Sequence, residues 1–253
     1  MNVNNRTERS VQCVTLEDKM DYTISDSTTF PIAEIHIARG ETMHIESGAM
    51  IYHNGQVKLD GHMNSNGKGG LGGMMRALGR SMTSGESFFI TTATGIGDDS
   101  ELGIAPANPG VIWPLRVGNG TQLRLNTGAF LAADPEVTYN MVRQKLSGAL
   151  FGGTGGLFVM ETAGTGTLLV SGYGDIIVLE LDGSKEYVVD NSHVVAWDQN
   201  LDYDIEVASG TFGFTTGEGL VNHFHGQGKV YVQTRNLESL ANSLKPYLPS
   251  SKD

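Results

Sequence analysis

The side chains best suited to chemistry in this sequence are histidines near its C-terminus. His223 and His225 flank Phe224 in the stretch HFH, so on a strand both imidazoles point to the same side. Imidazoles in such an arrangement are common ligands of zinc and other transition metals. A familiar metal motif of this form adds a glutamate a few residues later, and the following GQGKVYV contains none. A metal here would need ligands from elsewhere in the chain, and hydrogen-bonded or solvent-facing histidines are the competing interpretation.

His193 lies in a different setting, within the stretch VVDNSHVVAWD and close to Trp197 and Asp198. Its ring could form a hydrogen bond with Asp198 or with a backbone carbonyl, or it could contact a ligand. The sequence alone leaves these two interpretations open.

The familiar catalytic and nucleotide-binding motifs are missing from the chain. No serine is centred in G-x-S-x-G, no G-x-x-x-x-G-K-[ST] occurs, and the single cysteine, Cys13, excludes a CxxC pair. GKGGLG from Gly67 fits G-x-G-x-x-G, but it follows a polar segment rather than a predicted strand. We therefore predict no catalytic residues, no cofactor and a protein that is not an enzyme.

Three similar passages predict the elements that position these residues. GETMHIESGAM from Gly40, GTQLRLNTGAF from Gly120 and KEYVVDNSHVVAW from Lys185 each contain an alternating strand, a hinge and a second apolar strand. SFFITTATG, GLFVMETAG and KVYVQTRN follow them in the same order. The 34 glycines are dispersed between short β-branched and aromatic runs. We predict an all-β chain that forms one compact domain, 1–253. It contains three β-sandwich or barrel repeats, approximately 11–95, 96–165 and 166–235, around a pseudo-threefold axis.

The hinge and the strand after it raise two further expectations in the second repeat. Gly128 corresponds to Gly48 and Ser192, and we expect Gly128 to need a backbone conformation that only glycine adopts easily. In DPEVTYNMVRQKL, an Asp-Pro pair could also start a helix. The alternation at the corresponding place in the first repeat favours a strand from Val137 to Met141 instead.

The tail NLESLANSLKPYLP predicts the chain's one convincing helix, over residues 236–248. Asn236 can cap its N-terminus and Pro246 can end it. Helical spacing places Leu237, Leu240, Ala241 and Leu244 in one apolar stripe.

Two glycine-rich excursions contain apolar residues that could contact a partner, and the first also contains two arginines. They interrupt the first and second repeats, and the candidate residues are Met74, Met75, Arg76, Leu78, Arg80, Leu150 and Phe151. Such loops could fold back to plug barrel ends or a trimer axis. They could also form a flexible surface for a peripheral membrane or a protein partner.

Composition narrows the classes of partner and the compartment. The formal net charge is −11, which repels phosphate backbones, so we expect no nucleic-acid partner. One cysteine in 253 residues fits a reducing compartment. The sequence contains neither an apolar secretory segment nor a run approaching the ~20 apolar residues of a membrane span. We therefore predict a cytoplasmic protein.

The order of several stretches resembles a known family, named after the fungal "altered inheritance of mitochondria" protein. The stretches are SGAM, GESFFITTATG, LGIAPANPGVIWPL, NTGAFLAADPEV, GLFVMETAGTGTLLVSGYGDI, VVDNSHVVAWD and GEGLVNHFHGQGKVYVQTRNLESL, which run from about Ile35 to the C-terminus. The resemblance implies three units like the tryptophan RNA-binding attenuation protein (TRAP) in each chain, and ring-like trimers. It implies no established catalytic residues, and the inner-membrane role of the fungal member is not transferred to this chain.

Two functions of different classes follow from these observations. The first is a non-enzymatic β scaffold or interaction protein that forms a homo-oligomer, a trimer by the resemblance. The alternative is a small-ligand or metal-binding protein that uses His193, His223 or His225.

Overall fold

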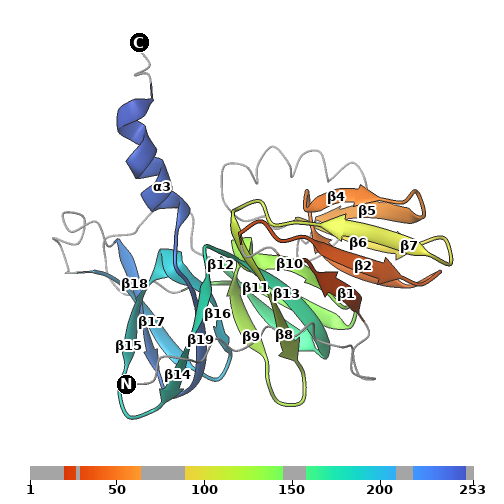
Figure 1. The fold of residues 1–253 in the computed structure, drawn as a ribbon. Coiled ribbons are helices and arrows are strands. Elements are labelled where there is room, and N and C mark those ends of the chain that lie inside the picture. Colours follow the sequence, from red (N-terminus) through yellow and green to blue (C-terminus); the bar gives the residue numbers. More distant parts are fainter. Residues whose placement is uncertain (1–19, 27–28, 64–88, 145–157, 209–218, 249–253) are drawn as a thin grey trace, which may run out of the picture.

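A computed structural model describes residues 20–26, 29–63, 89–144, 158–208 and 219–248 of the chain. Within these residues the chain forms strands β1 to β19, short 3-10 turns and the helix labelled α3 near the C-terminus. The predicted all-β class with a short C-terminal helix is confirmed. Figure 1 shows the strands gathered in sheets and α3 projecting away from them.

The strands pair in four antiparallel sheets. The first sheet has the order β1 (Asp21–Ile24), β2 (Ala33–Ile37), β7 (Ser100–Ile104), β4 (Met50–His53). The second sheet has the order β5 (Val57–Met63), β6 (Phe89–Gly95), β3 (Thr42–Glu46), β10 (Phe130–Ala133), β13 (Gly166–Tyr173), β8 (Gly110–Val117).

The other two sheets are built from strands between Leu123 and Gln233. The third sheet has the order β11 (Val137–Arg143), β12 (Phe158–Gly164), β9 (Leu123–Asn126), β16 (Val194–Asp198), β19 (Gln227–Gln233), β14 (Ile176–Asp182). The fourth sheet has the order β15 (Tyr187–Asp190), β18 (Leu220–His225), β17 (Asp202–Val207). The sequence favoured a strand over a helix from Val137, and β11 confirms it.

The pairing pattern recurs every six strands along the chain. We call β2–β7, β8–β13 and β14–β19 units one, two and three; they span residues 33–104, 110–173 and 176–233. The first, third and sixth strands of a unit form its leading trio, and the second, fourth and fifth form its trailing trio. In the second and third sheets, the trailing trio of one unit is joined edge to edge to the leading trio of the next, by β3·β10 and β9·β16. These two pairings are called joints below.

The units form an open row. Among the described strands, the first sheet contains only the leading trio of unit one and β1, and the fourth sheet contains only the trailing trio of unit three. Figure 1 shows β4 and β15 at opposite ends of the molecule. A pseudo-threefold arrangement and a likeness to TRAP are therefore not confirmed. The units are also offset from the predicted repeat boundaries, which stay a prediction.

The hydrophobic core lies between successive sheets and is divided into three clusters. One cluster includes Ile35 and Ile45 of unit one, with Leu131 of unit two. A central cluster is built mainly from unit two and includes Phe130. The third includes Trp197, whose ring is packed edge-on against Tyr203 and Phe224 at centroid distances of 5.0 and 5.6 Å. Strands inside the row are covered on both faces, which explains continuous apolar runs such as FLAA in β10.

The hinges between paired strands differ from the expectation. Gly48 in unit one has a φ of +90°, in the left-handed region that favours glycine. Gly128 has no positive φ and lies in a 3-10 turn, Thr127–Ala129. Ser192 lies in a similar turn, Asn191–His193, in which the Asp190 carboxylate accepts hydrogen bonds from the Ser192 amide and hydroxyl. The expectation for Gly128 was wrong, and Gly48 is the hinge that needs glycine.

Helix α3 spans Leu237–Leu244 and is shorter than the predicted segment 236–248. Asn236 caps it as expected, with its side-chain oxygen accepting from the Ser239 amide at 2.7 Å. Pro246 lies in a following 3-10 turn, Lys245–Tyr247. The predicted apolar stripe is not covered by other described residues, and Leu237, Leu240 and Leu244 are exposed.

Candidate functional site

Strand β4 occupies an open edge, although its counterparts in the other units are paired on both sides. No described strand pairs with the outer edge of β4. In β10 and β16, the four corresponding residues are all buried. In β4, by contrast, Met50 is 39% exposed and Ile51 is 55% exposed. Two apolar side chains that a joint would cover therefore face solvent.

The inner edge of β4 is held firmly to β7. The Tyr52 ring lies over Gly103, where an added Cβ would come within 2.3 Å of a ring carbon. The Tyr52 hydroxyl lies 2.7 Å from a Glu34 carboxylate oxygen and 2.8 Å from one of Glu101. Hydrogen bonding to these two carboxylates raises the pKa of the Tyr52 hydroxyl above its usual range. Strand β4 is thus an ordered strand with one free edge.

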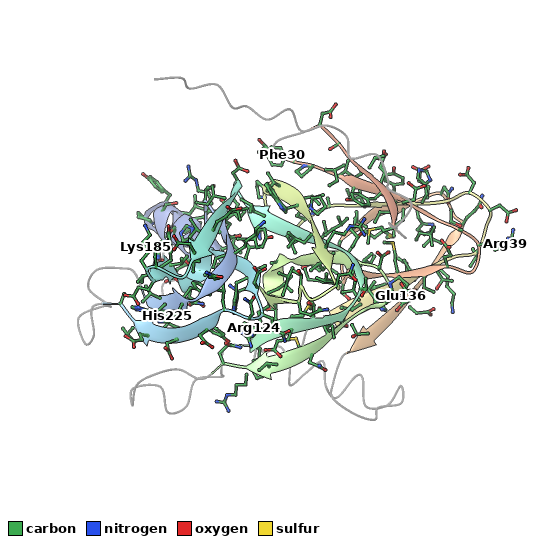
Figure 2. All side chains as sticks on the ribbon, turned by 90° about the horizontal axis from the view of Figure 1, so that it is seen from below. Phe30, Arg39, Arg124, Glu136, Lys185 and His225 are labelled. Carbon is green, nitrogen blue, oxygen red and sulfur yellow. The ribbon has the colours of Figure 1, made fainter. Side chains whose placement is uncertain are left out.

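Strand β15 is the opposite open end. Its counterparts β3 and β9 each pair with a strand on both sides, whereas β15 pairs only with β18 among the described strands. Val188 at the middle of β15 is 51% exposed. Figure 2 places Lys185, just before β15, at one end of the molecule, and Arg39 of unit one at the other.

The joint between units two and three shows what such an edge forms when it is paired. Arg124 of β9 donates to the Glu161 carboxylate at 2.7 Å and to the Gln199 carbonyl at 3.0 Å. Its guanidinium also lies 5.3 Å from the centre of the Tyr203 ring. The Asn126 amide donates to the Val194 carbonyl across the joint. This joint therefore combines strand pairing with partly buried polar contacts.

The two joints share one register. Ala132 lies opposite Ile45 in the first joint, and Ala196 lies opposite Leu125 in the second. The third strand of each unit also has the same register shift where it pairs with the sixth strand of its own unit. The shift lies at Met50/Tyr52, Phe130/Ala132 and Val194/Ala196. The hinge alignment makes Tyr52 the counterpart of Ala132 and Ala196, and Val189 the counterpart of Ile45 and Leu125.

His193 has hydrogen-bond partners at both ring nitrogens. Nδ1 lies 2.7 Å from the Gln233 carbonyl oxygen, and Nε2 lies 2.6 Å from the Asn236 amide nitrogen. Because the carbonyl only accepts and the amide nitrogen only donates, Nδ1 carries the proton and Nε2 accepts. The backbone partner is Gln233, and Asp198 instead accepts from the Lys229 amide. Through Asn236, His193 connects unit three to the cap of α3.

His223 and His225 lie on the same face of β18, as their spacing predicts. Both are near the Glu186 carboxylate, with His223 Nδ1 at 3.4 Å and His225 Nε2 at 3.8 Å from the same oxygen. Glu186 precedes β15 and lies 37 positions before His223 in the sequence. A motif that contains only the residues just after His225 therefore does not include it. The described residues contain no group of three or more His, Cys, Asp or Glu residues placed to hold a metal ion. Metal binding here stays a prediction.

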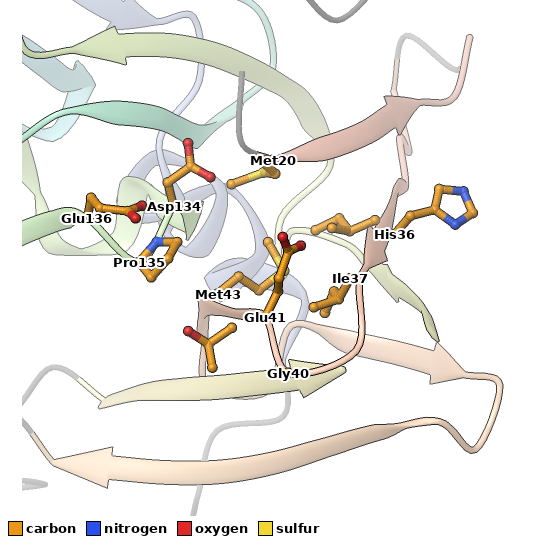
Figure 3. Close-up of a pocket in the computed structure, with 11 residues that line it drawn as sticks. Met20, His36, Ile37, Gly40, Glu41, Met43, Asp134, Pro135 and Glu136 are labelled. Carbon is orange, nitrogen blue, oxygen red and sulfur yellow. The ribbon is translucent and has the colours of Figure 1, made fainter. Parts of the chain in front are cut away.

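A cavity of about 560 Å³ lies where units one and two meet (Figure 3). Met20, Ile37 and Met43 form apolar parts of its wall, and Glu41 and Asp134 add carboxylates. Asp134 accepts from the Thr167 amide at 2.7 Å, so part of its hydrogen-bonding capacity serves the fold. No local sequence pattern indicates this cavity, because its wall combines residues from distant segments.

The glycine-rich loop candidates lie outside the described residues. These are Met74, Met75, Arg76, Leu78, Arg80, Leu150 and Phe151, together with the GKGGLG stretch. Their role as a partner or membrane surface stays a prediction. In the part of the chain that the structure describes, no helix is long and apolar enough to cross a membrane.

Comparisons with known proteins agree with this fold. A family model described as "Mitochondrial biogenesis AIM24" matches residues 22–235. The chain belongs to the AIM24 family. An uncharacterised protein of Streptococcus pyogenes serotype M6 is 47% identical over 239 residues, which cover 94% of this chain and 95% of that protein. A crystal structure of another Streptococcus pyogenes protein is similar, with a TM-score of 0.75 and 44% identity, over 91% of this chain and 100% of that one. The AIM24 resemblance seen in the sequence is confirmed.

Proposed function

We propose that this AIM24 protein is a non-enzymatic β scaffold that assembles with copies of itself through the open ends of its row of units. The observation that carries the proposal is the contrast at β4. Met50 and Ile51 are exposed at a position where both other units bury every residue. An exposed apolar edge strand is a template for pairing with another chain, and a stable monomer would need to block it.

A self-assembly also fits the chain's charge and composition. The net charge of −11 makes copies repel one another, so assembly must depend on strand pairing and apolar burial. The family resemblance favours a closed trimer, and the single cysteine favours a reducing compartment such as the cytoplasm. Ring closure would satisfy every open edge without forming a filament.

Light scattering with one variant and one matched control tests this function. We expect the wild-type mass to be a multiple of 27.1 kDa, and about 81 kDa for a trimer. Ile51→Lys should shift the mass toward the monomer. Ile96→Lys should not, because Ile96 is similarly exposed, at 51%, but lies in the turn after β6. High salt should leave the wild-type assembly intact, because screening weakens repulsion while apolar burial persists. A monomer mass for the wild type at low and high salt would rule out the scaffold.

One contact favours a second candidate function, metal or ligand binding by the histidines of unit three. A Glu186 carboxylate oxygen lies 3.4 Å from His223 Nδ1 and 3.8 Å from His225 Nε2, and a metal would need further ligands because these three residues are not placed to hold an ion by themselves. Elemental analysis of protein purified without a histidine tag tests it. A stoichiometric metal that is lost in His223→Ala would support metal binding. A metal-free protein that still assembles would contradict metal binding and leave the scaffold as the remaining function.

A further inference from the structure

The two open ends of the chain are complementary halves of one joint. Every joint within the chain pairs the second strand of one unit with the third strand of the next. The only described strands that lack this pairing are β4, a third strand, and β15, a second strand. By contrast, β5, β11 and β17 are sheet edges in all three units as far as the described strands show, so these edges do not distinguish one unit from another.

We propose that β4 of one copy pairs antiparallel with β15 of the next copy, in the register of the internal joints. This inference rests on the proposed function and names the strands and residues that perform it. Tyr52 lies opposite the partner's Val189, because Ala132 lies opposite Ile45 and Ala196 opposite Leu125. His53 lies opposite the partner's Val188, because Trp197 lies opposite Arg124.

The pairing must occur between chains and must be head-to-tail. Figures 1 and 2 place the two ends of the row far apart, so β4 cannot reach β15 of its own chain. The contact uses different strands on the two copies, so each copy keeps one free end until a ring closes. The first and fourth sheets of neighbouring copies then form one continuous sheet of the same design as the second and third.

The exposed side chains of β4 and β15 are those expected where two copies of the chain meet. Ile51 and Val188 are the exposed apolar residues at the middle of the two free strands, and both are about half exposed. Val189 is buried within its own chain, whereas Tyr52 lies on the exposed face of the first sheet, beside Gly103 and hydrogen-bonded to Glu34. The free edges of β4 and β15 and the accessible side chains along them, Tyr52 included, remain for a second copy to cover.

Cysteine crosslinking between two differently labelled chains tests the strand assignment. Each variant is made in a Cys13→Ser background, which removes the only native cysteine. One chain carries His53→Cys and the other Val188→Cys. Opposed antiparallel residues have Cα atoms about 4.5–5.5 Å apart, within the range of a disulfide. We expect mild oxidation of the mixture to give a crosslinked dimer on the order of ten-fold more abundant than in either variant alone, because the joint holds the thiols at high effective concentration.

The controls separate the possible failures. Lys58→Cys on the ordinary edge strand β5, mixed with Val188→Cys, should give only the collisional background. If His53→Cys alone crosslinks as well as the mixture, the contact is symmetric and the head-to-tail pairing is wrong. A second pair, Asn54→Cys with Tyr187→Cys, follows from Asp198 opposite Leu123 and is used if the first pair disturbs folding. If light scattering shows an oligomer but neither mixture gives a crosslink, the pairing of β4 with β15 is wrong and the proposed scaffold function still stands. A monomer overturns both.

Discussion

The joint between units two and three and the open ends of the row have the same design but opposite environments. Trp197 and His53 are counterparts on the third strand of a unit, and Arg124 and Val188 are counterparts on the second. Trp197 is fully buried and Arg124 is bound in a network, whereas His53 and Val188 are exposed. The strand pattern therefore repeats along the chain, but its side chains are adapted to whether the neighbour belongs to the same chain.

The largest difference is expected between Trp197→Ala and His53→Ala. Trp197→Ala removes a ring packed against Tyr203 and Phe224 and should lower the free energy of unfolding by about 3–5 kcal/mol. His53→Ala removes an exposed side chain and should change the monomer's stability by less than about 0.5 kcal/mol. Chemical denaturation of dilute protein measures both. Similar losses would mean that the two positions are not counterparts.

A smaller difference is expected between Arg124→Ala and Val188→Ala. Arg124→Ala leaves Glu161 and the Gln199 carbonyl without a partner and should cost about 2–3 kcal/mol. Val188→Ala should barely change the unfolding of dilute protein but should weaken assembly, because Val188 is covered only in the proposed joint. Denaturation and light scattering on the same samples separate the two effects. A monomer destabilised equally by both changes would argue against the open end at β15.

The hinges offer a comparison between unit one and unit two. Gly48→Ala places a Cβ at a φ of +90° and should destabilise by about 1–2 kcal/mol. Gly128→Ala should be neutral or slightly stabilising, because its turn has no positive φ and an added Cβ meets no atom within 4 Å. Thermal unfolding measures the pair, and a larger loss for Gly128→Ala would contradict the described turn.

The smallest expected effect concerns pH at the first joint. Burial raises the pKa of Glu46 from 4.5 to about 7. The folded state therefore binds more protons than the unfolded state between these values, so the stability contributed by this group is present below about pH 4.5 and is lost as pH rises toward 7. The counterpart of Glu46 at the second joint is the neutral Asn126. Glu46→Gln should remove this pH dependence and stabilise the protein by about 1 kcal/mol at pH 8, after allowance for solvent screening. Denaturation at pH 5 and pH 8 checks it, and an unchanged pH slope in the variant would contradict it.

Much of the fold is readable in the sequence because the paired strands alternate and the hinges are short. The passages around Gly48, Gly128 and Ser192 predicted strand, hinge and strand, and the structure has β3–β4, β9–β10 and β15–β16 at these places. The apolar stripe and the Asn236 cap predicted α3. These signals are local, so a single segment contains enough information to reveal them.

The candidate interface was harder to read because it depends on which strands meet. MIYH in β4 and FLAA in β10 are both apolar enough to be strands, and only the sheet order shows that one edge is open. The Glu186 contact with His223 likewise joins residues that are 37 positions apart. Pairing across such distances leaves no periodic signal in either segment.

Hydrogen exchange at the backbone amides of β4 shows whether this strand pairs with a second copy, because it reports on the open edge in the unmodified protein. We expect the β4 and β15 amides to be protected in assembled wild-type protein and to exchange faster in Ile51→Lys. The amides of the internal joint strand β10 should be equally slow in both proteins. Amides of β4 that exchange equally fast in concentrated wild-type protein and in the variant would contradict this pairing.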